Sequence, residues 1–159
     1  MNDYADSIKV GDTAEQRFKK CCLNRGKTVI DANRSQNILG HWDFMVDGEA
    51  VDVKARKKLH RHSHFYNDES VYIELRNVRG KRGWLYGNAH KFAFETPDGF
   101  IMILRDDLIA AVETLTQNIR CTTPTLYQLY NRGNRPDERV TMIKYDDLLV
   151  MDHYFIEDK

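Results

Sequence analysis

The chain has 159 residues, of which 42% are hydrophobic and 30% are charged, and its formal net charge at pH 7 is zero. This size and composition predict a single globular domain over residues 1–159, able to bury about 70% of its unfolded surface. The longest apolar runs are too short to span a bilayer, and residues 1–10 lack the basic start and apolar core of a signal peptide. We therefore expect no membrane association. The three cysteines, two of them adjacent, favour reduced thiols in the cytoplasm, or in the host-cell cytoplasm if the protein is viral.

The first half of the chain is expected to begin with a helix over residues 13–25. Asp12-Thr13-Ala14-Glu15 has the form of a capping box, and Gly26 suits the position that follows a helix end. The expected buried stripe of this helix is Ala14, Phe18, Cys21 and Cys22. The next expected elements are a short strand over 27–31, a hairpin over 41–55 and a basic loop over 56–69.

The second half is expected to alternate strands with helices. The expected strands are 71–76, 90–95, 100–105 and 140–145. The expected helical segments are one capped by Asp106 or Asp107, a single turn over 126–130, and a short last helix capped by Asp146. The buried face of the first of these is expected to be Leu108, Val112, Leu115 and Ile119. The order predicts an α/β fold, a mixed sheet flanked by helices.

The basic residues are concentrated in the middle of the neutral chain. Residues 52–91 contain ten lysines and arginines against four acids, a net charge of +6. Such a segment can form a phosphate-binding surface, and solvated surface side chains are the alternative interpretation. The side chains expected to contact nucleic-acid phosphates are Lys57, Lys58, Arg61, Arg79, Lys81 and Arg82.

The stretch HWDFMVDGEAVDVK, residues 41–54, is the most informative segment. Its Asp-Gly pair lies between two alternating apolar runs, which predicts a hairpin with a two-residue turn. This register pairs Val46 with Glu49 and, further along, Asp43 with Asp52. Because side chains alternate along a strand, one face is expected to carry Asp43, Asp52 and Lys54, and the other Trp42, Phe44, Val51 and Val53. Opposed like charges are destabilising, unless one carboxyl is protonated, both face water, or a cation lies between them.

Asp43, followed nine positions later by Asp52-Val53-Lys54, resembles the signature of the PD-(D/E)xK nuclease superfamily, which has the restriction-endonuclease-like fold. In that superfamily the two acidic positions end neighbouring strands of a hairpin, and a helix bearing a glutamate precedes them. Residues 11–15 resemble that helix, with Glu15 as its acid. The resemblance covers roughly residues 11–58. Trp42 stands where the name of the motif has proline.

The resemblance implies a metal-dependent DNA endonuclease that leaves a 5′-phosphate. Mg²⁺ or Mn²⁺ would be bound by Asp43, Asp52 and the Val53 carbonyl. Lys54 would orient or deprotonate the attacking water, or neutralise the transition state. Glu15 would hold a water-bound ligand or help a second metal. The alternative for Glu15 is a structural one, as the third residue of a capping box.

A small domain without a separate recognition module favours structure-selective cutting of junctions or branched DNA, as in Holliday-junction resolvases that act in DNA recombination. A homodimer is expected because cutting two strands needs paired active sites. The competing hypotheses are a non-catalytic DNA-binding or assembly protein with a nuclease-like fold, and an RNA-processing hydrolase.

Three further features have more than one interpretation. His60, His62 and His64 could suggest a metal cluster, but their spacing does not match a zinc site, and a solvated or DNA-contacting loop is favoured. Trp84 and Tyr86 could stack on unpaired bases, although core packing is favoured. Residues 154–156 could cover a sheet edge or form a dimer contact.

Overall fold

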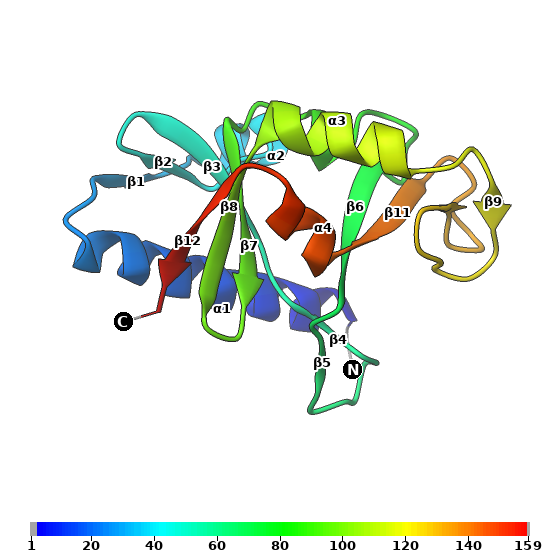
Figure 1. Ribbon diagram of the computed structural model, residues 1–159, viewed down its shortest axis with the longest axis horizontal. Coiled ribbons are helices and arrows are strands. Elements are labelled where there is room, and N and C mark those ends of the chain that lie inside the picture. The colour runs from blue at the N-terminus through cyan, green and yellow to red at the C-terminus, as the bar shows by residue number, and fades with distance from the viewer. Residues whose placement is uncertain (1–2, 159) are drawn as a thin grey trace.

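The computed structural model describes the backbone of residues 3–158 and the side chains from Thr13 onward (Figure 1). The helices are α1 (Asp3–Asn24), α2 (Arg34–Gly40), α3 (Arg105–Leu115), α4 (Tyr145–Val150) and the short 3₁₀ helix η1 (Trp84–Tyr86). The strands are β1 (Val29–Asp31), β2 (Phe44–Val46), β3 (Glu49–Lys54), β4 (Lys57–Lys58), β5 (Tyr66–Asn67), β6 (Ser70–Arg76), β7 (Lys91–Thr96), β8 (Gly99–Leu104), β9 (Arg120–Cys121), β10 (Leu129–Tyr130), β11 (Arg139–Lys144) and β12 (His153–Glu157). Among these described residues, no helix is both long and apolar enough to cross a membrane.

The main sheet has six strands in the order β1-β2-β3-β7-β8-β12. Its neighbours are antiparallel except β3 and β7, which are parallel. A second sheet has the order β6-β11-β10-β9, and β4 pairs with β5 in a separate ribbon. Helix α1 runs along one side of the main sheet, and α3 lies on the other side (Figure 1). The predicted mixed α/β architecture is confirmed.

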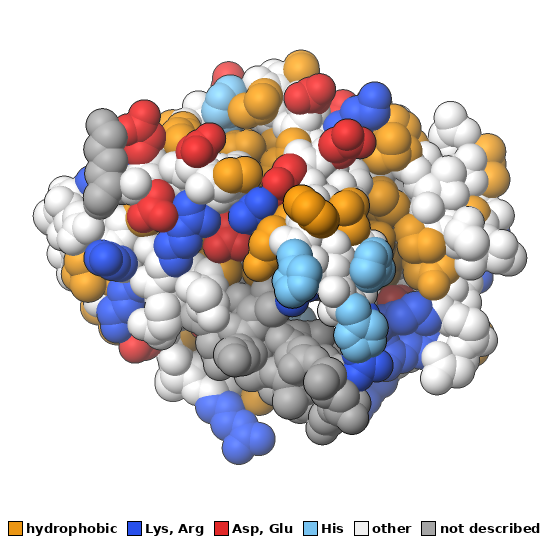
Figure 2. All heavy atoms as spheres, turned by 90° about the horizontal axis from the view of Figure 1, so that it is seen from below, with side chains coloured by type: hydrophobic (Ala, Val, Ile, Leu, Met, Phe, Trp, Pro, Cys, Tyr) orange, Lys and Arg blue, Asp and Glu red, His pale blue; other side chains and the backbone are white. Residues whose placement is uncertain are grey.

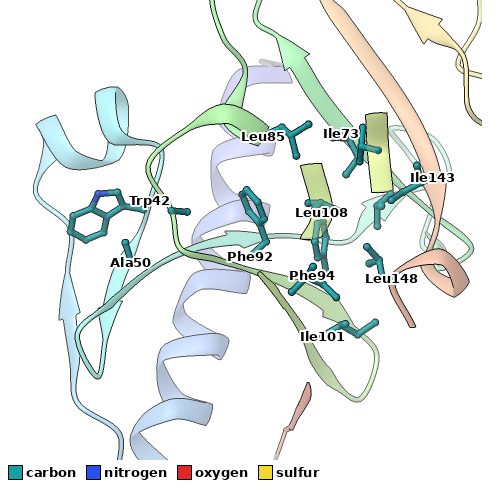
Figure 3. Close-up of a cluster of buried hydrophobic side chains, with 14 residues drawn as sticks. Trp42, Ala50, Ile73, Leu85, Phe92, Phe94, Ile101, Leu108, Ile143 and Leu148 are labelled. Carbon is teal, nitrogen blue, oxygen red and sulfur yellow. The ribbon is translucent and has the colours of Figure 1, made fainter. Parts of the chain in front are cut away.

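Two clusters of buried side chains pack on opposite faces of the main sheet. On one face, Ala14 and Phe18 of α1 pack against Val51 and Val53 of β3. The cluster on the other face joins the main sheet to β6, β11, α3 and α4 (Figure 3), and its largest fully buried members include Phe92, Phe94, Ile73, Leu85, Ile103, Leu108, Ile143 and Leu148. Since Val51 and Val53 face α1, the alternate residues of β3 face the second layer.

The start of α1 differs from the prediction, although its end does not. The helix is continuous from Asp3, so Asp12-Thr13 is not its N-terminus and the predicted capping box is wrong. A glycine inside a helix costs only about 1 kcal/mol, so Gly11 does not end it. The end is as predicted: Gly26 has φ +70°, and the Lys27 amide donates to the Cys22 carbonyl at 3.1 Å, which is a Schellman ending. The predicted buried stripe of α1 is confirmed.

The second half contains three local corrections. Residues 126–130 are not helical, because Tyr127 has φ +61° and β10 pairs with β9 and β11. Helix α3 begins at Arg105 without a side-chain cap, and Ile119 lies beyond its end and is 47% exposed. Helix α4 begins at Tyr145. The side chain that caps its start is Asp147 and not the predicted Asp146, because the Lys144 amide donates to Asp147 Oδ2 at 2.8 Å.

Several elements were not predicted, among them α2, the β4–β5 ribbon and β12. Helix α2 is capped by Asn33 and Gln36, whose side chains each accept from the other's backbone amide at 2.8–2.9 Å. The expected 56–69 loop contains the β4–β5 ribbon. Strand β12 pairs with β8, so residues 154–156 cover a sheet edge, as one of the two interpretations held.

The pairing of β12 with β8 depends on Gly99. Its φ is +152°, and an added Cβ would lie 2.1 Å from the Ile156 carbonyl oxygen. We expect Gly99→Ala to lower the free energy of unfolding by roughly 1–3 kcal/mol, measured by urea titration with circular dichroism. Gly133→Ala is the matched control, because no heavy atom lies within 4 Å of where its Cβ would be. Equal losses in both variants would contradict this account of β12.

Candidate active site

The predicted hairpin forms in the predicted register. Asp47 has φ +47° and Gly48 has φ +85°, as a two-residue turn with both central residues in the left-handed region requires. The pairs are Val46 with Glu49, Met45 with Ala50, and Phe44 with Val51. The next residues out are Asp43 and Asp52, so the turn brings the two acids together.

Asp43 lies just outside strand β2, and this changes the side on which Trp42 packs. Helix α2 ends at Gly40, and His41 follows with φ +55° and ψ +51°, a left-handed bend. After this bend Trp42 packs with Ala50 in the cluster shown in Figure 3. The prediction that Trp42 shares a face with Phe44 is therefore wrong, because the strand alternation on which it rested starts only at Phe44.

Both oxygens of the Asp43 carboxylate accept hydrogen bonds. Oδ2 accepts from the Val53 backbone amide and Oδ1 from Asn37 Nδ2, each at 2.7 Å. Because β2 stops at Phe44, the carboxylate takes the place of a strand carbonyl opposite Val53. These two bonds fix the carboxylate, which is part of a residue only 9% exposed.

Asp52 is buried beside Asp43 and next to the ammonium group of Lys54. Lys54 Nζ lies 2.8 Å from Asp52 Oδ2, yet the angles of this contact are not those of a hydrogen bond, and Oδ2 is buried without an aligned donor among the described residues. Burial raises the pKa of Asp52 to about 8; the interactions with Lys54 oppose this rise, and those with Asp43 add to it. Near neutral pH Asp52 therefore holds a proton, which is the response expected of a buried carboxyl group beside another carboxylate.

Other residues around Lys54 come from distant parts of the chain. Its ammonium group lies 4.2 Å from the centre of the Trp84 ring, a cation–π contact. Glu74 Oε1 accepts from the Trp84 amide at 3.3 Å. Burial and the charge of Lys54 lower the pKa of His41, and Glu74 partly offsets them. Asn37 was not among the predicted site residues.

The remaining predicted acid, Glu15, is on the other layer. It lies on α1 and is half-buried, and α1 packs on the face of β3 that carries Val51 and Val53. Asp52 and Lys54 alternate with those valines and point away from α1. Since α1 begins at Asp3, Glu15 is not the third residue of a capping box. Its catalytic role remains a prediction.

The predicted nucleic-acid contacts fall into two groups. Lys57 and Lys58 are exposed on β4, with Arg61 in the loop that follows. Although Lys57 is exposed as a residue, desolvation of its ammonium group and the nearby charges of Lys54 and Arg132 lower its pKa. Arg79, Lys81 and Arg82 lie on or beside a turn whose amides donate to Asn77 Oδ1 at 2.9 and 3.1 Å.

The histidines of the 60–64 loop are exposed. Figure 2 shows histidine side chains gathered beside lysines and arginines on one face of the molecule. Within the described part of the chain, no three His, Cys, Asp or Glu side chains come close enough to hold a metal on their own. A metal at Asp43 and Asp52 would thus need waters or a backbone carbonyl as further ligands, which is usual for Mg²⁺.

The raised pKa of Asp52 predicts a pH dependence of stability. Between the pKa of the unfolded chain, about 4, and about 8, the folded protein holds a proton that the unfolded chain has released. The contribution is therefore complete below pH 4 and is lost as pH rises towards 8, with a slope of up to about 1.4 kcal/mol per pH unit. Urea unfolding of wild type and Asp52→Asn at pH 5, 6 and 7 measures the difference in slope. Parallel curves for the two proteins would show that Asp52 ionises normally.

No family model, curated protein or solved structure matches the chain. Any functional assignment therefore depends on the geometry and chemistry of this site.

Proposed function

We propose that the protein is a metal-dependent DNA endonuclease of the PD-(D/E)xK type, with a restriction-endonuclease-like fold. The observation that carries the proposal is the buried pair Asp43 and Asp52 with the Lys54 ammonium 2.8 Å from Asp52. A fold gains no stability from placing two carboxylates together inside it. A strongly perturbed acid such as Asp52 is characteristic of functional sites.

The residues of the pair fit a hard divalent cation. Asp52 Oδ2 is buried without an aligned donor among the described residues, and carboxylate oxygens are the ligands that Mg²⁺ and Mn²⁺ prefer. Asp43, Asp52 and the Val53 carbonyl would hold the ion. When bound, it supplies a Lewis acid for the phosphoryl oxygens.

The residues of the chain have separate roles in this proposal. The bonds from Val53 and Asn37 hold the Asp43 carboxylate in place before any ligand binds. Lys54 is restrained by Asp52 and by the Trp84 ring, so its ammonium group is positioned to orient the attacking water or to stabilise charge on the phosphate. Lys57 and Lys58 on the neighbouring β4 would bind the phosphates that flank the cut.

The substrate and the assembly are also part of the proposal. The basic groups on β4 and on the 77–82 turn suit a DNA backbone, and such contacts read no sequence. We propose junctions or branched DNA as the substrate, and a homodimer as the active form, because two cuts need two sites.

Lys54→Ala is expected to lower the rate of DNA cleavage by about 100-fold or more, because it removes the group that orients water or neutralises charge. Cleavage of plasmid and of a four-way junction in Mg²⁺, then in EDTA, measures this. Binding to the junction in EDTA should change little. Lys20→Ala is the control, since Lys20 is exposed on α1.

Two results would contradict the proposal. If wild type retains both DNAs on a gel but cuts neither in Mg²⁺ or Mn²⁺, the protein is a non-catalytic DNA-binding protein. If it cuts only RNA, it is an RNA-processing hydrolase.

The proton on Asp52 predicts how metal binds. At pH 7 Asp52 must release about one proton when Mn²⁺ enters, since metals bind deprotonated carboxylates. Calorimetric titration in buffers with different ionisation enthalpies counts this proton, independently of activity. We expect Asp43→Asn to weaken Mn²⁺ binding at least about 10-fold, and Asp31→Asn, an exposed acid on β1, to leave it unchanged. Equal Mn²⁺ affinity in wild type and Asp43→Asn would remove the metal from the proposal.

A further inference from the structure

A second basic site lies away from the acidic pair. An open cavity of about 1040 Å³ is formed where the end of β6, the 80–88 segment, α3 and the 118–139 region meet. Five arginines line it: Arg76, Arg82, Arg105, Arg120 and Arg139. In the described chain, no aspartate or glutamate is among its lining residues. Four of these arginines were not among the residues expected to bind nucleic acid.

Three of the arginines form a row across neighbouring backbones. Arg139 of β11 pairs directly with Arg76 of β6, and Arg76 forms an antiparallel bridge with Arg82. Directly opposed like charges are destabilising. The row therefore concentrates positive charge, as the acidic pair concentrates acidic groups.

The arginines are only partly neutralised by their own fold. Arg120 Nη2 donates to Asn131 Oδ1 at 2.7 Å, and Arg139 Nη1 donates to the Pro136 and Glu138 carbonyls. Arg105 Nη1 donates to the Gly87 carbonyl. Its Nε lies 3.5 Å from Asp106 and is a buried donor without an aligned acceptor in the described chain.

Acidic residues near the cavity remain at its margin. Asp137 raises the pKa of Arg139, but burial and the charges of Arg120 and Arg76 outweigh it and lower that pKa overall. Glu113 accepts from the Tyr86 hydroxyl at 2.8 Å. Each guanidinium has five donors, so the cavity offers many more donors than these neighbours use.

We propose that this cavity binds the phosphates of an unpaired nucleic-acid strand. Arginines suit phosphate because their planar fork binds two oxygens at once. The volume of about 1040 Å³ slightly exceeds the range of roughly 300–1,000 Å³ that holds a small ligand, so it suits a few linked nucleotides and not a duplex. Tyr86 and the apolar residues Leu75, Ile109 and Leu129 also line it, and such surfaces can pack against bases.

The cavity and the acidic pair share one segment of chain. Trp84 of η1 lies on Lys54, whereas Tyr86 of the same turn lines the cavity. Asn88, also in the lining, donates its amide to the Gly40 carbonyl at 2.8 Å, next to His41. The 84–88 segment therefore contacts both the acidic site and the cavity. The choice of a nucleic acid as the ligand rests on the proposed nuclease function, which would make the unpaired strand an arm of its branched substrate.

The double variant Arg120→Gln/Arg139→Gln tests the proposal. Fluorescence anisotropy with a labelled oligo-dT strand, in EDTA so that no cutting occurs, should show at least about 10-fold weaker binding near 0.1 M salt. The plot of log K against log salt should become shallower by about 1.4, since each lost phosphate contact contributes about 0.7 for a single strand. Lys20→Gln/Arg34→Gln removes the same charge from exposed positions outside the cavity and should leave the slope unchanged. The single variant Arg82→Gln, at an exposed position, should make the slope shallower by about 0.7. It replaces the double variant as the test if the double variant does not fold.

Three outcomes would overturn the inference. One is an equal loss of affinity in the cavity variants and the control, which would mean that strand binding depends only on the net charge of the protein. Another is displacement of the strand by thymidine monophosphate or inorganic phosphate at matched phosphate concentration, which would indicate a site for a small anion. The third is a larger loss for duplex than for single strand. Failure of the nuclease proposal is seen separately, because wild type would then bind the strand without cutting DNA in Mg²⁺.

Discussion

The hydrogen bond from the Val53 amide to the Asp43 carboxylate is the interaction on which the site depends. It exists because β2 stops at Phe44 and leaves Val53 without a strand carbonyl on that side. Asp43 therefore completes the sheet and faces Asp52 at the same time. The backbone, and not a flexible side chain, sets the separation of the two acids, which is the support that a preorganised site needs. The cost is a buried carboxylate pair, which the protein relieves by holding a proton on Asp52.

The hairpin could be predicted because its information is local. Asp47-Gly48 specifies the turn, and the alternation of apolar residues specifies the register. The capping pattern was less reliable. It occurs at Asp12–Glu15, where the helix runs through it, and as Asn33–Gln36, where it starts α2. A four-residue pattern does not tell whether the residues before it are already helical. The left-handed His41 that reorients Trp42 follows from α2 and was missed with it.

The parts of the two sites that could not be predicted come from tertiary packing. Asn37 donates to Asp43, and Trp84 lies on Lys54. No spacing in the sequence connects these residues with the hairpin. Charge counting did locate the basic segment 52–91, but it separated Arg76 and Arg82 from Arg139, which lies 63 positions beyond Arg76 in the sequence. Only the pairing of β6 with β11 makes these arginines neighbours.

The molecule thus holds two clusters of like-charged side chains, one acidic and one basic. The opposite charges would cancel if Asp43 and Asp52 contacted the arginine row. Helix η1 lies between them: its Tyr86 lines the cavity, and its Trp84 covers Lys54. Keeping them apart costs stability at both places. External partners can offset that cost: a divalent cation relieves the acids, and a polyanion relieves the arginines. A phosphodiester strand with a bound metal ion supplies both charges in one ligand, which is why we interpret the two clusters as parts of one binding surface.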